Sequence, residues 1–273
     1  MVIPLILLID MFYLWLCIFI LITVIIVTSL LMRYLKEENV RTEEKNILLK
    51  KQMTSNIAHE LRTPVTSIRG YLETLLSCPD LPEEKRYSFI ERAYNQTLRL
   101  SELISDMSLI SKIEEKSSNF SKAEIDLYDI ANEVFEEFSE RMASKGVIID
   151  NQLIQGTLLN ANRTLIYSIL RNLVENSLKY AGDDITIHLD SFYDVSAKTY
   201  YVTYFDTGEG VPEEHLERIF ERFYRVQEGR TRDDGGSGLG LSIVRNAVDF
   251  HGGKIKVSNR EEGGLKFSFS LAR

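Results

Sequence analysis

Residues 1–32 form an almost uninterrupted apolar run. Asp10 is the only charged residue among them, and residues 11–32 carry no charge. A helix over the charge-free stretch would be about 33 Å long, enough to cross a hydrocarbon core of about 30 Å. No basic segment precedes the run and no small-residue cleavage site follows it, which disfavours a signal peptide. Residues 1–32 therefore predict a single transmembrane helix.

The basic residues that follow predict the orientation of this helix. Arg33 and Lys36 come directly after the apolar run, and such residues favour the cytoplasmic side of a membrane. We therefore expect a single-pass protein of the inner (cytoplasmic) membrane that contacts lipid through residues 1–32, with its C-terminal part in the cytoplasm. The pattern leaves open whether a stimulus is sensed within the membrane, by a partner, or by residues that precede this chain in a longer protein.

Residues 33–116 show the pattern of helices that pack in a bundle. Residues 33–54 are charged and contain neither glycine nor proline, which predicts a helix connecting to the membrane segment. Apolar residues then recur every three or four positions over Ala58–Leu75 and Ala93–Ile110, with a proline-containing turn between them. One hairpin cannot bury both apolar stripes, but two copies can. We therefore predict an all-α hairpin over residues 55–116 that forms a four-helix bundle in a homodimer.

The first helix of this hairpin carries a histidine beside its apolar seam. His59 follows the seam residue Ala58, so its imidazole is expected to point away from the core. Glu60 is its neighbour, and Thr63 follows one turn later on the same face. Pro64 is expected to kink the helix. Taken alone, this arrangement also fits an ordinary surface histidine of a bundle helix.

Composition narrows the class of protein. The chain has 273 residues, of which 44% are hydrophobic and 26% charged, so it has room for one or two globular domains besides the membrane segment. Its net charge of −8 argues against direct binding of nucleic acid. Cys17 and Cys78 lack metal-ligand spacing, and we interpret both as structural cysteines of a chain whose soluble part is reduced.

After a linker at Ser117–Lys122 the pattern becomes mixed. Helices are predicted at Leu127–Lys145, Asn162–Ala181 and Leu239–His251. Strands are predicted at Val147–Leu153, Ile185–Tyr193, Thr199–Asp206, Lys254–Ser258 and Lys266–Leu271. Strands that occur between helices without a regular βαβ alternation indicate an α+β sandwich with helices on one face of the sheet, and we predict this domain over residues 123–273.

The second of these predicted helices carries a polar stripe on an otherwise leucine-rich helix. Asn172, Asn176, Lys179 and Tyr180 fall at positions i, i+4, i+7 and i+8, which is one helix face. An amide oxygen suits Mg²⁺, which keeps several waters and phosphate oxygens as its other ligands. Lysine supplies a positive charge for a phosphate. In isolation the stripe also fits a solvated helix face.

Two glycine-containing segments lie further along the domain. Asp206 ends a predicted strand and is followed by Gly208 and Gly210. A carboxylate at a strand end can accept a hydrogen bond from an amino group such as that of adenine, but turns rich in aspartate and glycine are also common without a ligand. The segment Gly235–Leu241 leads directly into an apolar helix, and its members Gly236, Gly238, Leu239 and Gly240 can offer backbone N–H groups to phosphates.

Between these segments lies an aromatic stretch, Ile219–Arg225. Its phenylalanines fit a packed core, whereas Arg225 is a candidate for reaching a nucleotide phosphate or His59. Residues 227–236 are polar and charged, which suits a mobile lid over a bound nucleotide.

The motifs resemble, in order and spacing, those of the sensor histidine kinases of two-component systems. The stretch His59-Glu-Leu-Arg-Thr-Pro64 matches their phosphoacceptor box residue for residue. The four C-terminal clusters match the asparagine, first glycine, phenylalanine and second glycine boxes of their ATP-binding domain, which is of the GHKL type. The resemblance covers about residues 50–273.

This resemblance implies a bound nucleotide and a phosphoryl-transfer reaction for the chain. It implies that ATP and Mg²⁺ bind the C-terminal domain, with the metal on Asn176 and the adenine at Asp206. It also implies that His59 accepts the γ-phosphoryl group and passes it to an aspartate in the receiver domain of a response regulator. Glu60 can hold the other ring N–H of the histidine and take up its proton. By the same resemblance, Thr63 implies a phosphatase activity toward the regulator.

Two rival classes are weaker on the residues present. A GHKL-fold ATPase uses a glutamate one turn before the metal asparagine, but that position is Asn172 here, and Glu175 is rotated by about 100° from Asn176 on the helix. An inactive membrane scaffold would not need competent side chains at every motif position, and here each motif position has one.

Overall fold

A computed structural model describes residues 3–115, 120–226 and 236–272 of the chain. The side chains of residues 1–22 and 42–52 fall largely outside this description. Internal contacts divide the chain into two compact units, Met1–His59 and Glu60–Arg273.

The first unit is helical throughout its described part because nothing in its sequence interrupts a helix. Helix α1 extends from Ile3 to Ser77, and the sequence between Pro4 and Pro64 contains no glycine or proline. The helix also remains helical at Pro64. The kink expected there stays a prediction.

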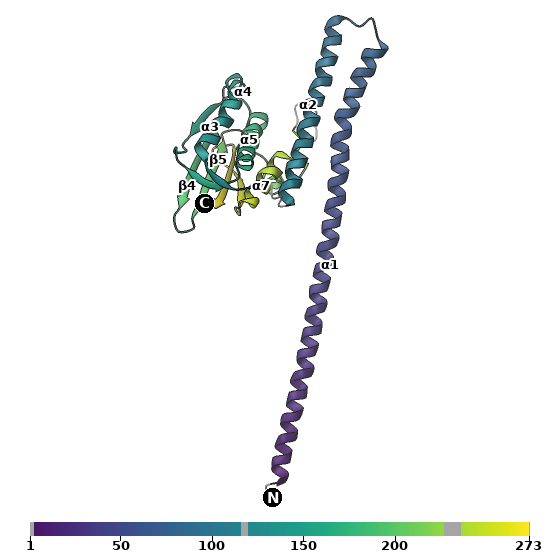
Figure 1. The fold of residues 1–273 in the computed structure, drawn as a ribbon, viewed down its shortest axis with the longest axis vertical. Helices are drawn as coiled ribbons and strands as arrows, with labels where there is room; N and C mark the ends of the chain where they lie inside the picture. The colour runs from purple at the N-terminus through teal and green to yellow at the C-terminus, as the bar shows by residue number, and fades with distance from the viewer. Residues whose placement is uncertain (1–2, 116–119, 227–235, 273) are drawn as a thin grey trace. The chain divides into compact units, whose positions relative to one another are not determined.

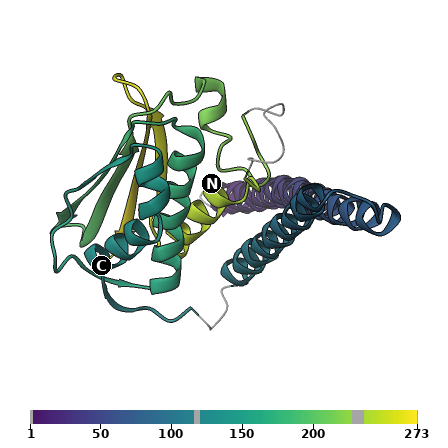
Figure 2. The same cartoon turned by 90° about the horizontal axis from the view of Figure 1, so that it is seen from above.

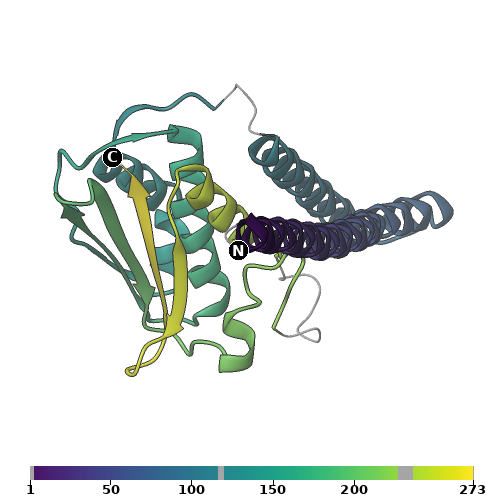
Figure 3. The same cartoon turned by 90° about the horizontal axis from the view of Figure 1, so that it is seen from below.

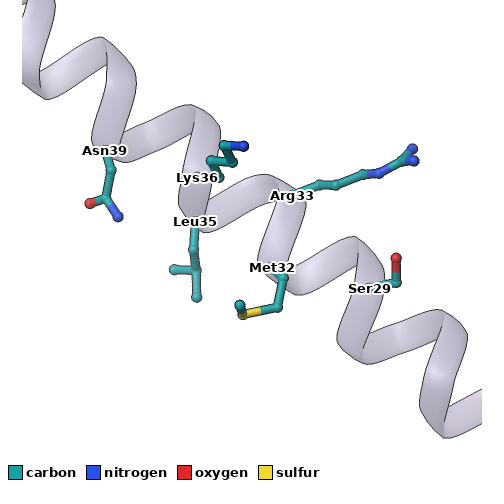
Figure 4. Close-up of a pocket in the computed structure, with 6 residues that line it drawn as sticks. All are labelled: Ser29, Met32, Arg33, Leu35, Lys36 and Asn39. Atoms are coloured by element: carbon teal, nitrogen blue, oxygen red, sulfur yellow. The ribbon is translucent and has the colours of Figure 1, made fainter.

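The change from apolar to charged sequence is visible on α1. The four side chains of Val24–Val27 are each 52–62% exposed. Figure 4 shows Met32 and Leu35 on one side of the helix and Arg33 extended away from them. Over the residues that the structure describes, no helix is both long enough and apolar enough to cross a membrane. The span predicted for residues 1–32 falls largely on side chains outside that description.

The second unit begins with a helical hairpin. The last part of α1, Glu60–Ser77, is followed by a turn and by helix α2 (Glu83–Glu114), which runs back along it (Figure 1). Pro82 stands at the start of α2, a position that proline tolerates because the first N–H groups of a helix have no partner. The rings of Tyr71 and Phe89 stack across the hairpin, with centroids 5.8 Å apart. The predicted all-α hairpin is confirmed.

This hairpin leaves part of its apolar surface uncovered. Side chains on both helices are at least 47% exposed: Val65, Leu72, Leu76, Ile90, Leu98 and Ile104. An apolar stripe of this kind is what a second hairpin would cover in a four-helix bundle.

The rest of the second unit is built on a five-stranded sheet of order β2-β4-β5-β7-β6. Its strands are β2 (Ile148–Asn151), β4 (Thr186–Asp194), β5 (Thr199–Asp206), β6 (Ile255–Asn259) and β7 (Leu265–Ala272). Only β2 and β4 pair in parallel, and the other neighbours are antiparallel. A separate pair of strands joins β1 (Ala123–Asp126) to β3 (Leu158–Ala161).

The helices of this domain form a second layer. They are α3 (Leu127–Glu137), α4 (Ser139–Ser144), α5 (Arg163–Tyr180), α6 (Glu213–Leu216) and α7 (Gly240–Phe250). Figures 2 and 3 show the strands of the sheet in one layer, with α3, α5 and α7 together against one of its faces. The predicted α+β sandwich is therefore confirmed.

The alternation of side chains along the central strands explains the core between these layers. Ile187 and Leu189 of β4 and Tyr204 of β5 are 0% exposed, and Val202 is 1% exposed. Each is two residues from the next on its own strand, so they share the inward face. The described helices cover this face with leucine, isoleucine and valine.

The structure corrects several predicted elements. The predicted helix Leu127–Lys145 is two helices, because the chain leaves helical geometry at Phe138. Strands β1 and β3 were not predicted, since each has four residues and pairs only with the other. The short helix α6 was also not predicted.

Candidate functional site

Helix α5 presents the polar stripe that the sequence predicts. The helix begins where the Asn162 side chain accepts a hydrogen bond from the Leu165 N–H at 3.1 Å. Asn172 donates through Nδ2 to the Ser168 carbonyl oxygen at 2.7 Å. Asn176 is half-buried, and its side chain makes no hydrogen bond to the described residues, which leaves its amide oxygen available to a ligand.

Charged side chains of α5 pair with one another beside this stripe. The Lys179 Nζ lies 2.7 Å from Glu175 Oε1, and Arg171 Nη1 lies 3.5 Å from Glu175 Oε2. Burial raises the pKa of the Glu175 carboxyl, but Lys179 and Arg171 together outweigh it and hold that pKa below its ordinary value. Glu175 is therefore an ionised partner of two cations rather than a carboxylate directed at a water.

Strand β5 ends at a buried carboxylate. Asp206 is 2% exposed. Its Oδ1 accepts from the Gly208 N–H at 3.1 Å and from the Leu265 N–H at 3.2 Å. Its Oδ2 accepts from the Ser177 hydroxyl at 2.7 Å. The carboxylate of β5 is thereby joined to α5 through Ser177.

The glycines that follow Asp206 allow close packing. A Cβ on Gly208 would lie 2.4 Å from the Ala181 carbonyl oxygen, so the segment passes directly over the end of α5. Gly210 has φ +75°, and a Cβ there would lie 2.6 Å from Asn259 Oδ1. The Asn259 side chain ties this turn to β6 by accepting from the Val211 N–H at 3.0 Å.

The second glycine segment lies against the polar stripe of α5. The Gly236 N–H donates to the Tyr180 hydroxyl at 3.2 Å. A Cβ on Gly240 would lie 2.5 Å from Asn172 Oδ1. Leu239 is 0% exposed and immediately precedes α7. Two clusters that are more than 50 residues apart in sequence therefore meet at the N-terminal end of α7, where backbone N–H groups favour anions.

The aromatic stretch packs on the same glycine segment. The Phe223 N–H donates to the Gly238 carbonyl oxygen at 2.8 Å. A Cβ on Gly238 would lie 2.8 Å from the Phe223 backbone, and Gly238 has φ +71°, so this position requires glycine on both counts. Arg225 follows two residues after Phe223 and is half-buried. The predicted lid falls mainly on residues 227–235, which lie outside the described residues.

Helix α2 packs against the start of α7. Leu103 and Ile110 of α2 form one buried cluster with Leu239 and Ile243, and all four are at most 1% exposed. An ion pair between Arg222 and Glu114 extends this contact. The sequence pattern assigned Leu103 and Ile110 to the bundle seam. The structure instead uses them to cover the glycine segment and α7.

A carboxyl group lies inside this contact. The Ser237 hydroxyl donates to Asp106 Oδ2 at 3.4 Å. Burial raises the pKa of Asp106 to about 6; Arg171 acts against this, and Glu175 adds to it. Asp106 was not predicted, because on sequence it is one of many acidic residues on a helix face.

The predicted acceptor residues lie on α1. His59 is exposed and is the last residue of the first unit, whereas Glu60 and Thr63 are half-buried and belong to the second unit. The nucleotide-site candidates Asn176, Asp206 and Gly236–Gly240 also belong to the second unit. The structure thus brings the four C-terminal clusters together.

Two polar residues of this site were missed on sequence. Ser177 and Tyr204 are each 0% exposed, and the Tyr204 hydroxyl donates to Ser177 Oγ at 3.0 Å. Both occupy positions where the helix or strand periodicity expects an apolar residue. A hydroxyl at such a position was the available signal for a buried polar contact.

Two protein-family models match parts of the chain. Residues 49–116 match the family model of the His Kinase A (phospho-acceptor) domain, and residues 161–273 match that of the histidine kinase-, DNA gyrase B-, and HSP90-like ATPase. The chain thus combines a phosphoacceptor hairpin with a GHKL-type ATP-binding domain. It belongs to the sensor histidine kinases of two-component systems.

Curated relatives agree with this assignment. The sensor histidine kinase WalK of Bacillus subtilis is 30% identical over 235 residues, and the signal transduction histidine-protein kinase BaeS of Escherichia coli is 31% identical over 230 residues. The alignments cover 85% and 84% of this chain but 38% and 48% of those proteins. The chain therefore spans about half the length of these relatives or less.

Solved structures share the fold. The histidine kinase AdeS of Acinetobacter baumannii superposes with a TM-score of 0.65 at 22% identity, over 78% of this chain and 97% of that one. The histidine kinase ThkA, in a crystal structure with the response regulator protein TrrA, superposes with a TM-score of 0.61 at 29% identity. That match covers 86% of this chain and 65% of ThkA.

Proposed function

We propose that this chain is an ATP-dependent protein-histidine kinase that phosphorylates its own His59 and passes the phosphoryl group to an aspartate of a response regulator. The observation that carries the proposal is the convergence of Asp206, Asn176 and the Gly236–Gly240 segment on a domain of this family. The chain also carries an exposed histidine in a phosphoacceptor hairpin.

The residues present fit ATP. Asp206 Oδ2 retains acceptor capacity for the amino group of adenine, since Ser177 is its one donor among the described residues. Glycine at positions 236, 238 and 240 lets phosphates approach the backbone N–H groups at the start of α7. Lys179 supplies positive charge beside Gly236, where a Cβ would lie 3.7 Å from its Nζ, and Arg225 is a second candidate cation.

The same residues fit Mg²⁺ as a companion of the phosphates. The Asn176 amide oxygen is a hard ligand, and one protein oxygen suffices because Mg²⁺ keeps waters and phosphate oxygens as its other ligands. When bound, the ion neutralises charge on the phosphoryl group. Asn176 would hold the ion, while Asp206 would hold the adenine.

His59 accepts the phosphoryl group as a neutral imidazole. Its attacking nitrogen must carry no proton, so the other ring nitrogen carries the N–H. Glu60 is the adjacent carboxylate that holds this N–H and takes up the proton. Thr63, one turn away, positions a water for the phosphatase reaction on the phosphorylated regulator.

Hydrolysis of ATP as the main activity is disfavoured by Glu175. This carboxylate is committed to Lys179 and Arg171, and Asn172 occupies the position one turn before Asn176. No carboxylate of α5 among the described residues is therefore oriented to activate a water. An inactive scaffold is disfavoured because the ligand-facing positions named above keep competent side chains.

The proposal includes a membrane anchor and a dimer. Residues 11–32 are free of charge and are followed by Arg33 and Lys36, which supports a single span with the kinase domains in the cytoplasm. The exposed apolar stripe on the hairpin supports a homodimer that buries it in a four-helix bundle.

Phosphotransfer from γ-labelled ATP tests the proposal. We expect membranes containing the 273-residue chain to acquire an acid-labile, base-stable label that is absent in His59→Gln. His188→Gln is the matched control, since His188 is a half-buried histidine on β4, and it should keep the label. Label that survives in His59→Gln would refute the assignment of His59 as the phosphoryl acceptor. Phosphate release without a labelled protein would indicate an ATPase.

A further inference from the structure

Asp206 is the last member of a hydrogen-bond chain that begins in the hydrophobic core. The Tyr204 hydroxyl donates to Ser177 Oγ at 3.0 Å, and the Ser177 hydroxyl donates to Asp206 Oδ2 at 2.7 Å. Tyr204 and Ser177 are 0% exposed. The relay, as we call Tyr204–Ser177–Asp206, connects α5 to β5 behind the proposed base site.

Counting lone pairs shows which oxygen of Asp206 remains open. Each carboxylate oxygen offers about two acceptor positions. Oδ1 accepts from the N–H groups of Gly208 and Leu265, so both of its positions are taken. Oδ2 accepts from Ser177 alone among the described residues. One acceptor position is left, and its direction is fixed by where the Ser177 hydrogen bond lies.

The hydrogen bonds of the relay also run in one direction, from Tyr204 through Ser177 to Asp206. Burial raises the pKa of the Tyr204 hydroxyl far above its ordinary value, so Tyr204 stays protonated and acts as a donor. Ser177 accepts this bond and has a single proton, which it gives to Asp206. The hydrogen bonds that the described residues make to the Asp206 side chain are therefore all donated to it, so its carboxylate acts only as an acceptor.

We propose that Ser177 and Tyr204 are positioning residues that set the purine selectivity of the site by holding the open lone pair of Asp206 Oδ2 toward a 6-amino group. The proposal rests on the assignment of Asp206 to the base under the proposed function. A 6-amino purine donates to this oxygen, whereas a 6-oxo purine presents an acceptor to an acceptor. Such a mismatch leaves two buried acceptors unpaired. Unpaired buried polar groups are costly, so the site should discriminate strongly against the 6-oxo purine.

A purely structural role for the relay makes a different prediction. If Tyr204 and Ser177 only satisfied each other in the core, their loss would weaken the fold and reduce binding of every purine nucleotide alike. A positioning role instead changes the ratio of two affinities. The informative quantity is therefore the dissociation constant for inosine diphosphate divided by that for adenosine diphosphate, since these ligands differ only at the 6-position of the purine ring and in the N1 proton that accompanies the 6-oxo group.

Two single variants, their double variant and one matched control measure this ratio in the full 273-residue chain in detergent. Tyr204→Phe removes the hydroxyl and keeps the ring in place beside Phe267, 6.3 Å away between centroids. Ser177→Ala removes the last donor of the relay. Tyr201→Phe removes a hydroxyl from the same strand at a side chain that is 47% exposed.

We expect the ratio to fall about fivefold in Tyr204→Phe, as for loss of one hydrogen bond, and about tenfold in Ser177→Ala, where the bond to the charged group is lost. Tyr201→Phe should keep the wild-type ratio. The double variant should match Ser177→Ala, because Tyr204 acts on Asp206 only through Ser177. Thermal unfolding of each variant provides the separate measure of stability.

Other outcomes would overturn the proposal in distinguishable ways. If both dissociation constants rise by the same factor in Tyr204→Phe, or if the two substitutions lower the ratio independently, the relay has no positioning role. If Ser177→Ala does not fold, Tyr204→Phe alone decides. A wild-type chain that binds adenosine diphosphate no better than inosine diphosphate would refute the assignment of Asp206 to the base itself.

Discussion

Acid is expected to strengthen the contact between α2 and the start of α7, because Asp106 is held there in surroundings that favour its protonated form. Burial is the main cause, and it raises the pKa of this carboxyl from 3.8 to about 6. Arg171 and the Ser237 hydroxyl lower that pKa, while Glu175 and Glu102 raise it. Replacing Asp106 with asparagine removes the charge and keeps the shape.

The size of the effect follows from the two pKa values. A carboxyl with a pKa of 3.8 when exposed and about 6 in the contact destabilises the contact by about 3 kcal/mol when it is ionised, at about 1.36 kcal/mol per tenfold change. Since Asp106 is only half-buried, solvent screening reduces this to about 1–2 kcal/mol.

The sign follows from the direction of the shift. Because the pKa of Asp106 is raised in the folded chain, its favourable contribution is fully present below pH 3.8 and is lost as the pH rises through about 6. Asp106→Asn should therefore be more stable than wild type by about 1–2 kcal/mol above pH 6, and the difference should shrink toward zero near pH 4.

Urea unfolding at a series of pH values measures this difference. Asp80→Asn, in the exposed turn of the hairpin, is the matched control and should show no such pH dependence. A stability difference between Asp106→Asn and wild type that is the same at pH 5 and pH 7.5 would refute the reasoning. So would equal behaviour of the two asparagine variants.

Three further substitutions test other parts of the site. Asn176→Ala should remove the gain in affinity for adenosine diphosphate that Mg²⁺ gives, with little change in metal-free binding; an unchanged response to Mg²⁺ in titration calorimetry would exclude Asn176 as the ligand. Gly238→Ala should lower stability by about 1–3 kcal/mol and weaken ATP binding, because φ is +71° and the new Cβ would lie 2.8 Å from Phe223. Gly156→Ala, with φ +89° and nothing within 4 Å, isolates the backbone cost and should leave ATP affinity unchanged. His251 is buried, and burial holds its pKa below 6.5, so its contribution to stability is present above pH 6.5 and is lost as the pH falls through its lower folded value. Melting temperatures measured at a series of pH values should fall less steeply toward acid pH in His251→Gln than in wild type. An identical pH dependence in the two proteins would contradict this role of His251.

The sequence could predict the motif residues because their signals are local. Asp206 ends a run of alternating residues, and the Asn172–Tyr180 stripe lies on one face of a single helix, so spacing alone places them. Their convergence could be inferred only from the family resemblance. In the structure it depends on Gly236 reaching Tyr180 and on Ser177 reaching Asp206, contacts between residues 56 and 29 positions apart.

The packing of α2 against α7 could not be predicted from the sequence, because the same apolar spacing is compatible with two different packing partners. Leu103 and Ile110 have the spacing of a bundle seam, and the same spacing lets α2 cover Leu239 and Ile243. Apolar periodicity states which face is buried and not what buries it. Ser177 and Tyr204 were missed for a related reason, since a hydroxyl inside an apolar pattern becomes meaningful only when its partner is known.

The position of Leu239 links the hairpin to the proposed nucleotide site. Leu239 stands between Gly238 and Gly240, and its side chain is covered by the α2 cluster. Ser237, one residue earlier, donates to Asp106 of α2. Side chains of this segment are held by α2, and in the proposed nucleotide site its backbone would bind phosphates, so we expect a change in one contact to affect the other. Because such coupling is reciprocal, a nucleotide that shifts this segment must alter the α2 contact, and a displacement of α2 must alter nucleotide affinity by the same factor. Protonation of Asp106 acts on the same contact, so the affinity of the wild-type chain for adenosine diphosphate should depend on pH between about 4 and 6 in a way that Asp106→Asn removes.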